Sequence, residues 1–336
     1  MNLRDGAWPV FGWTDDMRPV LARARDQGRT VALATIVALE GSAPRLPGTQ
    51  MVFDGASASG HFSGGCIEAD VANHAAQVVR TGEPALLRYG RNSPWIDIRL
   101  TCGSGMEILV ERIAPDDSGI ARLLDLSAKR SPAIYTSDGR HRTVDSFAGE
   151  PYLAFAHSPL SLTLTHAPPW RLIVVGGNPT ALAIAQLATQ AGLATTLLCP
   201  GGPQAPPPIG CVDYRNGDAL AALNDVAPDS WTAVALALHE PEIEHRLLTA
   251  SLRSDAGYIG ALGAAARLPG RRKRLEQAGL SPHDLVRIHA PMGLARCGKA
   301  PWEVAVSVIA EILETRAAAQ ARTNNCDETV LDALRR

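Results

Sequence analysis

The sequence predicts a two-domain α/β protein, with an N-terminal α+β domain followed by a Rossmann-like domain built on a doubly wound parallel sheet. Three observations lead to this prediction. The chain has 336 residues, which is more than one ordinary hydrophobic core holds. After residue 170, strand and helix patterns alternate regularly, as they do in parallel sheets covered by helices. Between the two halves, His166-Ala167-Pro168-Pro169 can continue neither a strand nor a helix.

We therefore expect the domain boundary near Pro168. The N-terminal domain is expected over residues 1–165 and the Rossmann-like domain over residues 170–316. A loosely ordered tail is expected over residues 317–336. Because 46% of the residues are hydrophobic, the chain can bury a sizeable core in each domain.

The N-terminal domain begins with a predicted helix over residues 15–27 and a strand over 31–39. The strand is expected to be buried, because it is an apolar run without a charge. A loop over 40–48 follows, since its two glycines and two prolines exclude regular structure. A helix is expected over 67–80, with a stop at Thr81-Gly82. The other expected elements are strands over 51–53, 86–89, 96–100 and 106–111, a helix near 117–129 and a hairpin around Asp138-Gly139.

The Rossmann-like domain opens with a predicted strand, helix and strand, and a proline-rich loop over 200–208 follows. His239 and His289 fall in loops at the ends of strands, where open α/β sheets place ligand contacts. Arg271-Arg272-Lys273-Arg274 is interpreted as the exposed face of a helix. The expected elements are strands over 172–175, 195–199, 233–238 and 258–259, and helices over 180–190, 242–252 and from Pro301 onward.

The composition argues against several classes of function. The 32 basic and 34 acidic residues are well mixed and give a formal charge of -2, so no strong field attracts nucleic acid. The N-terminus lacks a signal-peptide pattern, and no segment offers about 18 uninterrupted apolar residues. We therefore expect a cytoplasmic protein without membrane contact. Six cysteines without a Cys-x-x-Cys pair indicate neither a disulfide framework nor a structural metal site.

The second domain starts with an altered dinucleotide fingerprint, Gly176-Gly177-Asn178-Pro179-Thr180-Ala181. The first glycine is present and Ala181 is an acceptable third, but the central position, where the backbone approaches a pyrophosphate, is Asn178. The acid that would hold a ribose falls at Cys199. We therefore expect the Rossmann fold without NAD(P) binding, and we interpret this domain as a supporting or regulatory half.

Two loops of the N-terminal domain combine glycines with a thiol. Ser63-Gly64-Gly65-Cys66 leads into the helix over 67–80, where unpaired amides and the helix dipole favour an anion or a thiolate. Thr101-Cys102-Gly103-Ser104-Gly105 lies between two expected strands, and its glycines allow a ligand to approach closely. One such loop is typical of a tight turn, but two in one domain favour a ligand site. Arg45 is a further candidate, because an arginine can bind phosphate bidentately.

Six segments carry a resemblance to a known family. They are Glu40-Gly41-Ser42-Ala43-Pro44-Arg45, Ser63-Gly64-Gly65-Cys66-Ile67-Glu68, Cys102-Gly103-Ser104-Gly105, Gly257-Tyr258-Ile259-Gly260-Ala261-Leu262-Gly263, His289-Ala290-Pro291-Met292-Gly293-Leu294 and Pro301-Trp302-Glu303-Val304-Ala305. At these residues, and over nearly the whole chain, the sequence resembles the XdhC/CoxI family, accessory proteins that mature xanthine dehydrogenase and related molybdenum hydroxylases. It departs from the family in the second domain, with Asn178-Pro179 and Cys199 where relatives tend to show a Gly-x-Gly-His start and an acid.

The resemblance implies a protein that binds the molybdenum cofactor, as molybdopterin or its cytosine dinucleotide. Such a protein delivers the cofactor to an apo molybdenum hydroxylase, during sulfuration by a cysteine desulfurase. It is a chaperone that turns over no metabolite, so no catalytic residue and no metal ligand is assigned. Molybdopterin carries a phosphate and a dithiolene, for which amide-rich glycine loops and soft thiols are suitable contacts. The candidate cofactor contacts are Cys66, Cys102, Gly64, Gly65, Gly103, Gly105, Arg45, Glu68, Gly176 and Gly177, and the two cysteines would contact the cofactor or relay a persulfide.

Two other functions stay open at this point. One is an NAD(P)-dependent oxidoreductase, which the Rossmann-like fold allows and which Asn178 and Cys199 argue against. The other is a cofactor-free scaffold that recruits a desulfurase and a hydroxylase, for which both cysteines would be dispensable. The apolar closing helix around residues 304–313 fits a homodimer interface as well as an intrachain core.

Overall fold

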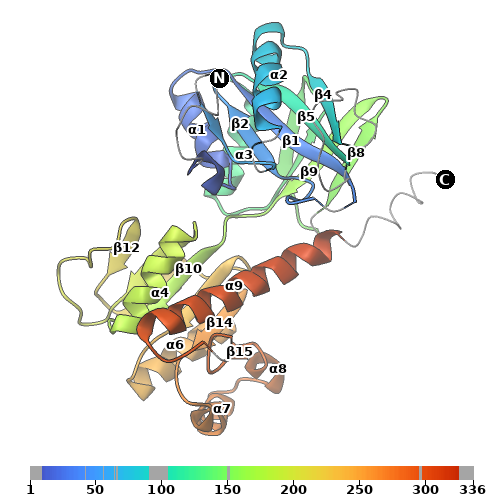
Figure 1. The fold of residues 1–336 in the computed structure, drawn as a ribbon. Helices are drawn as coiled ribbons and strands as arrows, with labels where there is room; N and C mark the ends of the chain where they lie inside the picture. The colour runs from blue at the N-terminus through green and yellow to red at the C-terminus, as the bar shows by residue number, and fades with distance from the viewer. Residues whose placement is uncertain are drawn as a thin grey trace. The chain divides into compact units, whose positions relative to one another are not determined.

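The computed structural model describes residues 10–41, 43–55, 57–63, 65, 67–90, 105–149, 152–294 and 297–324. The chain divides into two compact units: the residues up to Pro168 make up the main part of the first, and Pro169–Arg322 form the second (Figure 1). Antiparallel sheets form the first unit and a parallel sheet forms the second. The predicted fold class, an α+β domain followed by a Rossmann-like domain, is therefore confirmed.

The first unit contains a five-stranded antiparallel sheet in the order β3-β2-β1-β5-β4. Its central strand β1 pairs with β5 from Val31, opposite Ile113, to Glu40, opposite Gly105. Alternate residues of β1 enter two different cores, on the two faces of the sheet, which explains the continuous apolar run. The strands are β1 (Val31–Glu40), β2 (Gln50–Phe53), β3 (Ala58–Ser59), β4 (Ala85–Gly90) and β5 (Gly105–Ile113).

Helix α2 (Glu68–Thr81) packs on one face of this sheet. Helices α1 (Arg18–Asp26) and α3 (Ser118–Ala128) share the core on the other face with a second sheet, ordered β7-β6-β9-β8. Strands β8 and β9 go beyond the expected elements, and the strand expected over 96–100 lies outside the described residues. The remaining elements are η1 (Val10–Trp13), β6 (Ala133–Ser137), β7 (Arg142–Ser146), β8 (Leu153–His157) and β9 (Leu160–His166).

The second unit is a six-stranded parallel sheet in the order β12-β11-β10-β13-β14-β15. Numbered from β10, this is the order 3-2-1-4-5-6 of a doubly wound dinucleotide-binding fold. The strands are β10 (Arg171–Val175), β11 (Ala194–Leu198), β12 (Val212–Arg215), β13 (Thr232–Leu236), β14 (Tyr258–Ala261) and β15 (Ile288–His289).

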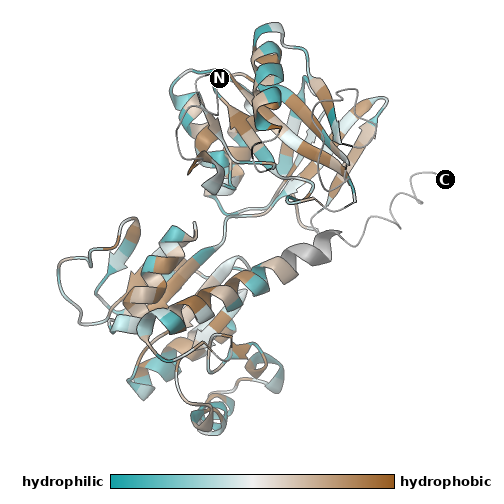
Figure 2. Cartoon of the chain, viewed as in Figure 1, coloured by the Kyte–Doolittle hydropathy of each residue, from teal (hydrophilic) through white to brown (hydrophobic). Residues whose placement is uncertain are grey.

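Helices bury both faces of the parallel sheet, and Figure 2 shows its central strands as strongly hydrophobic. Helices α4 (Pro179–Gln190) and α9 (Pro301–Asn324) cover one face. The other face is covered by α5 (Ala219–Val226), α6 (Pro241–Arg253), α7 (Leu268–Gln277) and α8 (Pro282–Leu285), and a short helix η2 (Ala265–Arg267) precedes α7. Helix α9 extends beyond residue 316, where we expected the second domain to end.

The structure corrects one expectation about the basic run at the start of α7. Arg271 is 5% exposed, and its Nε donates a hydrogen bond of 2.8 Å to Glu244 on α6. The interpretation of residues 271–274 as an exposed face is therefore wrong for Arg271, because Arg271 is buried in an ion pair with Glu244 on α6. The helix expected at residues 271–274 is α7, whereas strand β12, helices α5 and α8 and strand β15 were not expected, because each is short.

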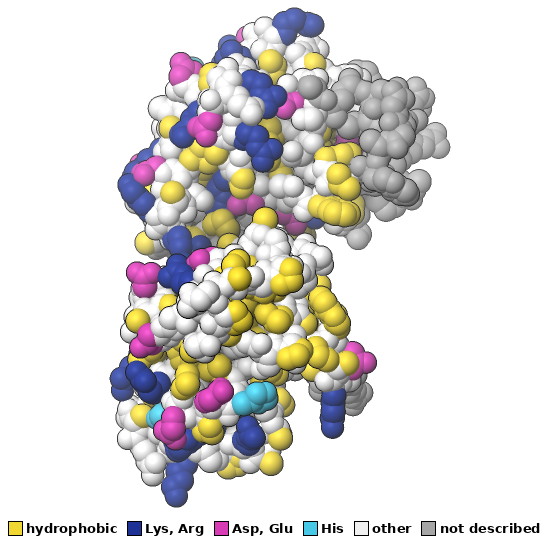
Figure 3. Space-filling view, turned by 90° about the vertical axis from the view of Figure 1, so that its left-hand side faces the viewer, with side chains coloured by type: hydrophobic (Ala, Val, Ile, Leu, Met, Phe, Trp, Pro, Cys, Tyr) yellow, Lys and Arg dark blue, Asp and Glu magenta, His cyan; other side chains and the backbone are white. Residues whose placement is uncertain are grey.

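The surface carries both signs of charge. Figure 3 shows Lys and Arg side chains interspersed with Asp and Glu over one side of the protein. Among the described residues, no helix is both long and apolar enough to cross a membrane.

Candidate functional site

Two of the sequence motifs in the first unit meet at one edge of the five-stranded sheet. Strands β1 and β4 end at Glu40 and Gly90, and both residues pair with Gly105, where β5 begins. Glu40, where the loop over residues 40–48 begins, therefore lies next to Gly105, the last residue of the cysteine-containing motif. A Cβ atom at Gly105 would lie 3.3 Å from Oε2 of Glu40, so little space separates the two segments.

A cluster of charged side chains lies at this edge. Arg88 on β4 donates hydrogen bonds to Glu40 and to Glu107, the latter at 2.7 Å. The hydrogen bond to Glu40 raises the pKa of Arg88. His157, from β8 of the second sheet, donates from Nε2 to Oε2 of Glu107 over 3.0 Å. Arg88 and Glu107 are direct partners across β4 and β5, so strand register brings their charges together.

The second motif loop is organised around Glu68, which is 1% exposed. Its Oε1 accepts the backbone N–H groups of Phe62, at 3.0 Å, and Ser63, at 2.6 Å. Its Oε2 accepts the Ser63 hydroxyl at 2.8 Å and the N–H of Ile67 at 3.2 Å. Burial by itself would raise the pKa of Glu68, but the hydrogen bonds from Ser63, supported by that of Phe62, lower it below its ordinary value. The Glu68 carboxylate thus holds both ends of its own loop.

A hydrogen bond connects strand β4 to helix α2. The hydroxyl of Tyr89 on β4 donates to Oδ2 of Asp70, in the first turn of α2, over 2.7 Å. Tyr89 is fully buried, and burial raises its pKa well above the ordinary range. The N-terminus of α2, which follows the Ser63 loop, therefore lies at the same edge as Glu40, Gly90 and Gly105.

Some of the predicted cofactor contacts of the first unit lie among the described residues, and others do not. Gly65 has φ +101°, a conformation that favours glycine, and a Cβ atom there would have no neighbour within 4 Å. Arg45 pairs with Asp15, while its Nε is buried with no hydrogen-bond partner in the described part of the chain. Cys66, Cys102, Gly64 and Gly103 lie outside the described residues.

The fingerprint loop of the second unit is filled by the protein's own atoms. Asn178 is the N-cap of α4: its Oδ1 accepts the N–H of Ala181 at 3.0 Å, and its Nδ2 donates to the carbonyl of Ala237 at 2.6 Å. A Cβ atom at Gly176 would collide with the same carbonyl. At Gly177 it would lie 2.5 Å from the sulfur of Cys199. Close packing therefore accounts for both glycines without a ligand.

One cluster in the second unit could not be found from sequence spacing. Glu311 on α9 accepts hydrogen bonds from Nδ1 of His289 at 3.1 Å, the hydroxyl of Tyr258 at 2.6 Å and the N–H of Gly293 at 2.7 Å. Burial opposes ionisation of Glu311, but these donors outweigh it and lower its pKa. His289 thus has an acidic partner, whereas His239 is exposed. In the described part of the chain, no group of three or more His, Cys, Asp or Glu side chains is arranged to hold a metal ion.

Comparison with known proteins shows which family this chain resembles in both units. A model described as "XdhC and CoxI family" matches residues 24–90, and one described as "XdhC Rossmann domain" matches residues 172–312. The chain is 28% identical to "Molybdenum cofactor insertion chaperone PaoD" of Escherichia coli, over 90% of each chain. It is 26% identical to a protein of Bacillus subtilis that is named a probable xanthine dehydrogenase subunit, over 88% of this chain and 96% of that one.

A solved structure shares the fold of both units. The crystal structure of a xanthine dehydrogenase from Bacillus halodurans superimposes with a TM-score of 0.71 at 21% identity, and the alignment covers 90% of this chain and 96% of that one. The two family models match one segment in each of the two units. The chain therefore belongs to the XdhC and CoxI family.

Proposed function

We propose that this protein binds the molybdenum cofactor and delivers it to an apo molybdenum hydroxylase of the xanthine dehydrogenase type. One observation carries the proposal: Glu40 and Gly105, from two of the motifs, pair at one edge of the five-stranded sheet, and Tyr89 at that edge bonds to the first turn of α2, which follows the Ser63 motif. The molybdenum cofactor is cargo in this function, since the protein holds it and releases it again.

The chemistry of this edge suits such a cargo. The phosphate of molybdopterin is an anion, and successive backbone N–H groups in glycine-rich loops bind anions. The thiols of Cys66 and Cys102 belong to the same loops in the sequence, and sulfur ligands suit the soft, sulfur-rich end of the cofactor. Arg45 supports the proposal as well, because its buried Nε has no hydrogen-bond partner among the described residues.

The residues of the edge would then have two different roles. Gly64, Gly65, Gly103 and Gly105, with Arg45 and the two cysteines, would contact the cargo. Glu68 would not, because its carboxylate is buried and already bonded to its own loop. We therefore assign Glu68 a positioning role, in which its carboxylate binds the N–H groups of Phe62, Ser63 and Ile67 on the two sides of the loop.

The relatives support delivery rather than turnover. The Escherichia coli protein, which is similar over 90% of both chains, is named an insertion chaperone for the molybdenum cofactor. An oxidoreductase that uses NAD(P) is the weaker alternative, because the Asn178 side chain bonds to the N-terminus of α4, where a pyrophosphate would bind. The action of a cysteine desulfurase on the bound cargo, and a homodimer, stay predictions that pull-down and gel filtration can check.

A transfer assay tests the proposal. The chain is loaded with molybdenum cofactor under anaerobic conditions and mixed with an apo molybdenum hydroxylase, and the hydroxylase activity that appears is measured. The loaded chain should restore more activity than an equal amount of free cofactor, because the chain shields the cofactor from water until the hydroxylase takes it up. Glu276→Gln, which changes an exposed carboxylate in the second unit, should behave as the wild type does. Equal activation by free cofactor and by the loaded chain would contradict delivery.

A further inference from the structure

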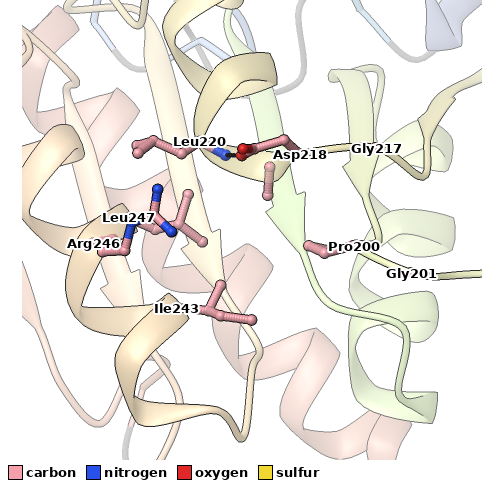
Figure 4. Close-up of a pocket in the computed structure, with 9 residues that line it drawn as sticks. Pro200, Gly201, Gly217, Asp218, Leu220, Ile243, Arg246 and Leu247 are labelled. Atoms are coloured by element: carbon pink, nitrogen blue, oxygen red, sulfur yellow. Dashed lines mark hydrogen bonds between the residues drawn. The ribbon is translucent and has the colours of Figure 1, made fainter.

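A pocket of about 340 Å³ lies in the second unit, and its lining includes none of the fingerprint residues 176–181 (Figure 4). Pro200 lines it directly after β11, and Gly217 lines it after β12. The opposite wall comes from α6, which follows β13. The pocket is therefore built from segments that leave the carboxyl ends of three strands, which is where open α/β sheets bind ligands. Its volume lies at the lower end of the range of about 300 to 1,000 Å³ that is typical of small-molecule sites.

The pocket combines an apolar wall with two polar side chains. Leu220 on α5 and Ile243 on α6 supply apolar surface that suits a flat ring. Arg246 on α6 also lines the pocket, and its guanidinium forms no hydrogen bond or ion pair with the described residues. An exposed arginine without a protein partner is free to bind an anionic group.

Asp218 supplies the second polar group. Its Oδ1 accepts the N–H groups of Leu220 at 2.8 Å and Ala221 at 3.2 Å, so it caps α5. Its Oδ2 accepts no hydrogen bond from the described part of the chain, and it remains available to hydroxyl donors. The N–H groups of Ala221 and Leu220, followed by the charge of Arg246, lower the pKa of Asp218. The carboxylate is therefore ionised at neutral pH and lies near Arg246.

At the N-terminus of α4, where a dinucleotide phosphate usually binds, the N–H of Ala181 already donates to the side chain of Asn178. In the pocket, Arg246 offers a different binding group for a phosphate. We propose that the pocket binds a nucleoside monophosphate unit, with the base against Leu220 and Ile243 and the phosphate on Arg246. The ribose hydroxyls would donate to Oδ2 of Asp218. The unit can come from a free nucleotide or from the nucleotide part of a larger molecule.

This site lies in the second unit, and it does not depend on the function proposed for the first. Isothermal titration calorimetry on the full chain tests it, with AMP, CMP and inorganic phosphate as separate titrants. At least one nucleotide should bind with a Kd below 1 mM, and at least tenfold more tightly than phosphate, because phosphate lacks the base and the ribose.

Three variants sharpen this test. Arg246→Met should weaken nucleotide binding at least tenfold. Arg272→Met, which changes an exposed arginine of α7 outside the pocket, should leave binding unchanged. Asp218→Asn keeps an N-cap residue on α5, and it should weaken binding of the ribonucleotide more than binding of its 2′,3′-dideoxy analogue. The proposal is overturned if neither nucleotide binds at 5 mM, which corresponds to a ΔG° of roughly -3 kcal/mol. It is also overturned if phosphate binds as tightly as the nucleotides, or if the Arg246→Met variant binds them as tightly as the wild type does.

Discussion

The hydroxyl of Tyr89 donates a hydrogen bond of 2.7 Å to Asp70, and this bond joins the end of β4 to the first turn of α2. Removing the hydroxyl leaves a charged carboxylate without its buried donor. Tyr89→Phe should therefore lower the free energy of unfolding by about 1–2 kcal/mol, measured by urea denaturation. Tyr152→Phe is the matched control, because the Tyr152 hydroxyl forms no hydrogen bond with the described residues. An equal loss in both variants would mean that the bond adds nothing.

Glu68→Gln should destabilise the Ser63 loop by about 2 kcal/mol, because the amide NH2 group would face the donors that now bond to Oε2. The effect should depend on pH. The folded state lowers the pKa of Glu68 below 4.5, so its stabilising contribution is complete above pH 4.5 and is lost as the pH falls through the folded pKa. Denaturation of wild type and variant at several pH values should show their difference shrinking below pH 4.5. A constant difference would contradict the assignment.

His166 should make the first unit sensitive to mild acid. Burial, and then the charge of Arg18, lower its pKa to about 4 from 6.5, while Asp16 opposes this shift. Between those pH values the unfolded chain binds the proton and the folded chain does not, so stability falls as the pH drops from 6.5 to 4. The loss should reach at most about 3 kcal/mol. His166→Gln should flatten this fall, and His141→Gln, at an exposed position, should not.

Asn178→Ala should cost about 1–2 kcal/mol, since it removes both the cap of α4 and the bond to the Ala237 carbonyl. Asn224→Ala changes an exposed asparagine inside α5, and it should be neutral or slightly stabilising because alanine favours helix. Thermal and urea denaturation of the two variants can be compared directly. No loss in Asn178→Ala would show that its side chain is free to make room for a ligand.

The regular elements could be predicted because their signals are local. The strand at 31–39 is a continuous apolar run, and α2 ends directly before Gly82, whose φ is +77°. The departure from the dinucleotide fingerprint at Asn178 could likewise be predicted from the sequence, because the fingerprint has a glycine at that position. These features depend on residues that are close together in the chain.

The side-chain clusters could not be predicted, because packing between distant segments decides them. Glu311 and His289 are bonded although 22 residues separate them in the sequence, and Glu244 and Arg271 are bonded across 27 residues. The pairing of Arg88 with Glu107 depends on the register of β4 against β5. Sequence motifs therefore predicted the candidate loops, and only the fold shows that Glu40 and Gly105 are neighbours.

The central claim is that the loops at this edge hold the molybdenum cofactor through Cys66 and Cys102. The most direct measurement is the amount of oxidised pterin, detected by fluorescence, that copurifies anaerobically with each variant. The Cys66→Ala, Cys102→Ala double variant should retain at least tenfold less pterin than the wild type, while Cys297→Ala, at an exposed position of the second unit, should retain as much. Full retention of pterin by a folded double variant would contradict the account.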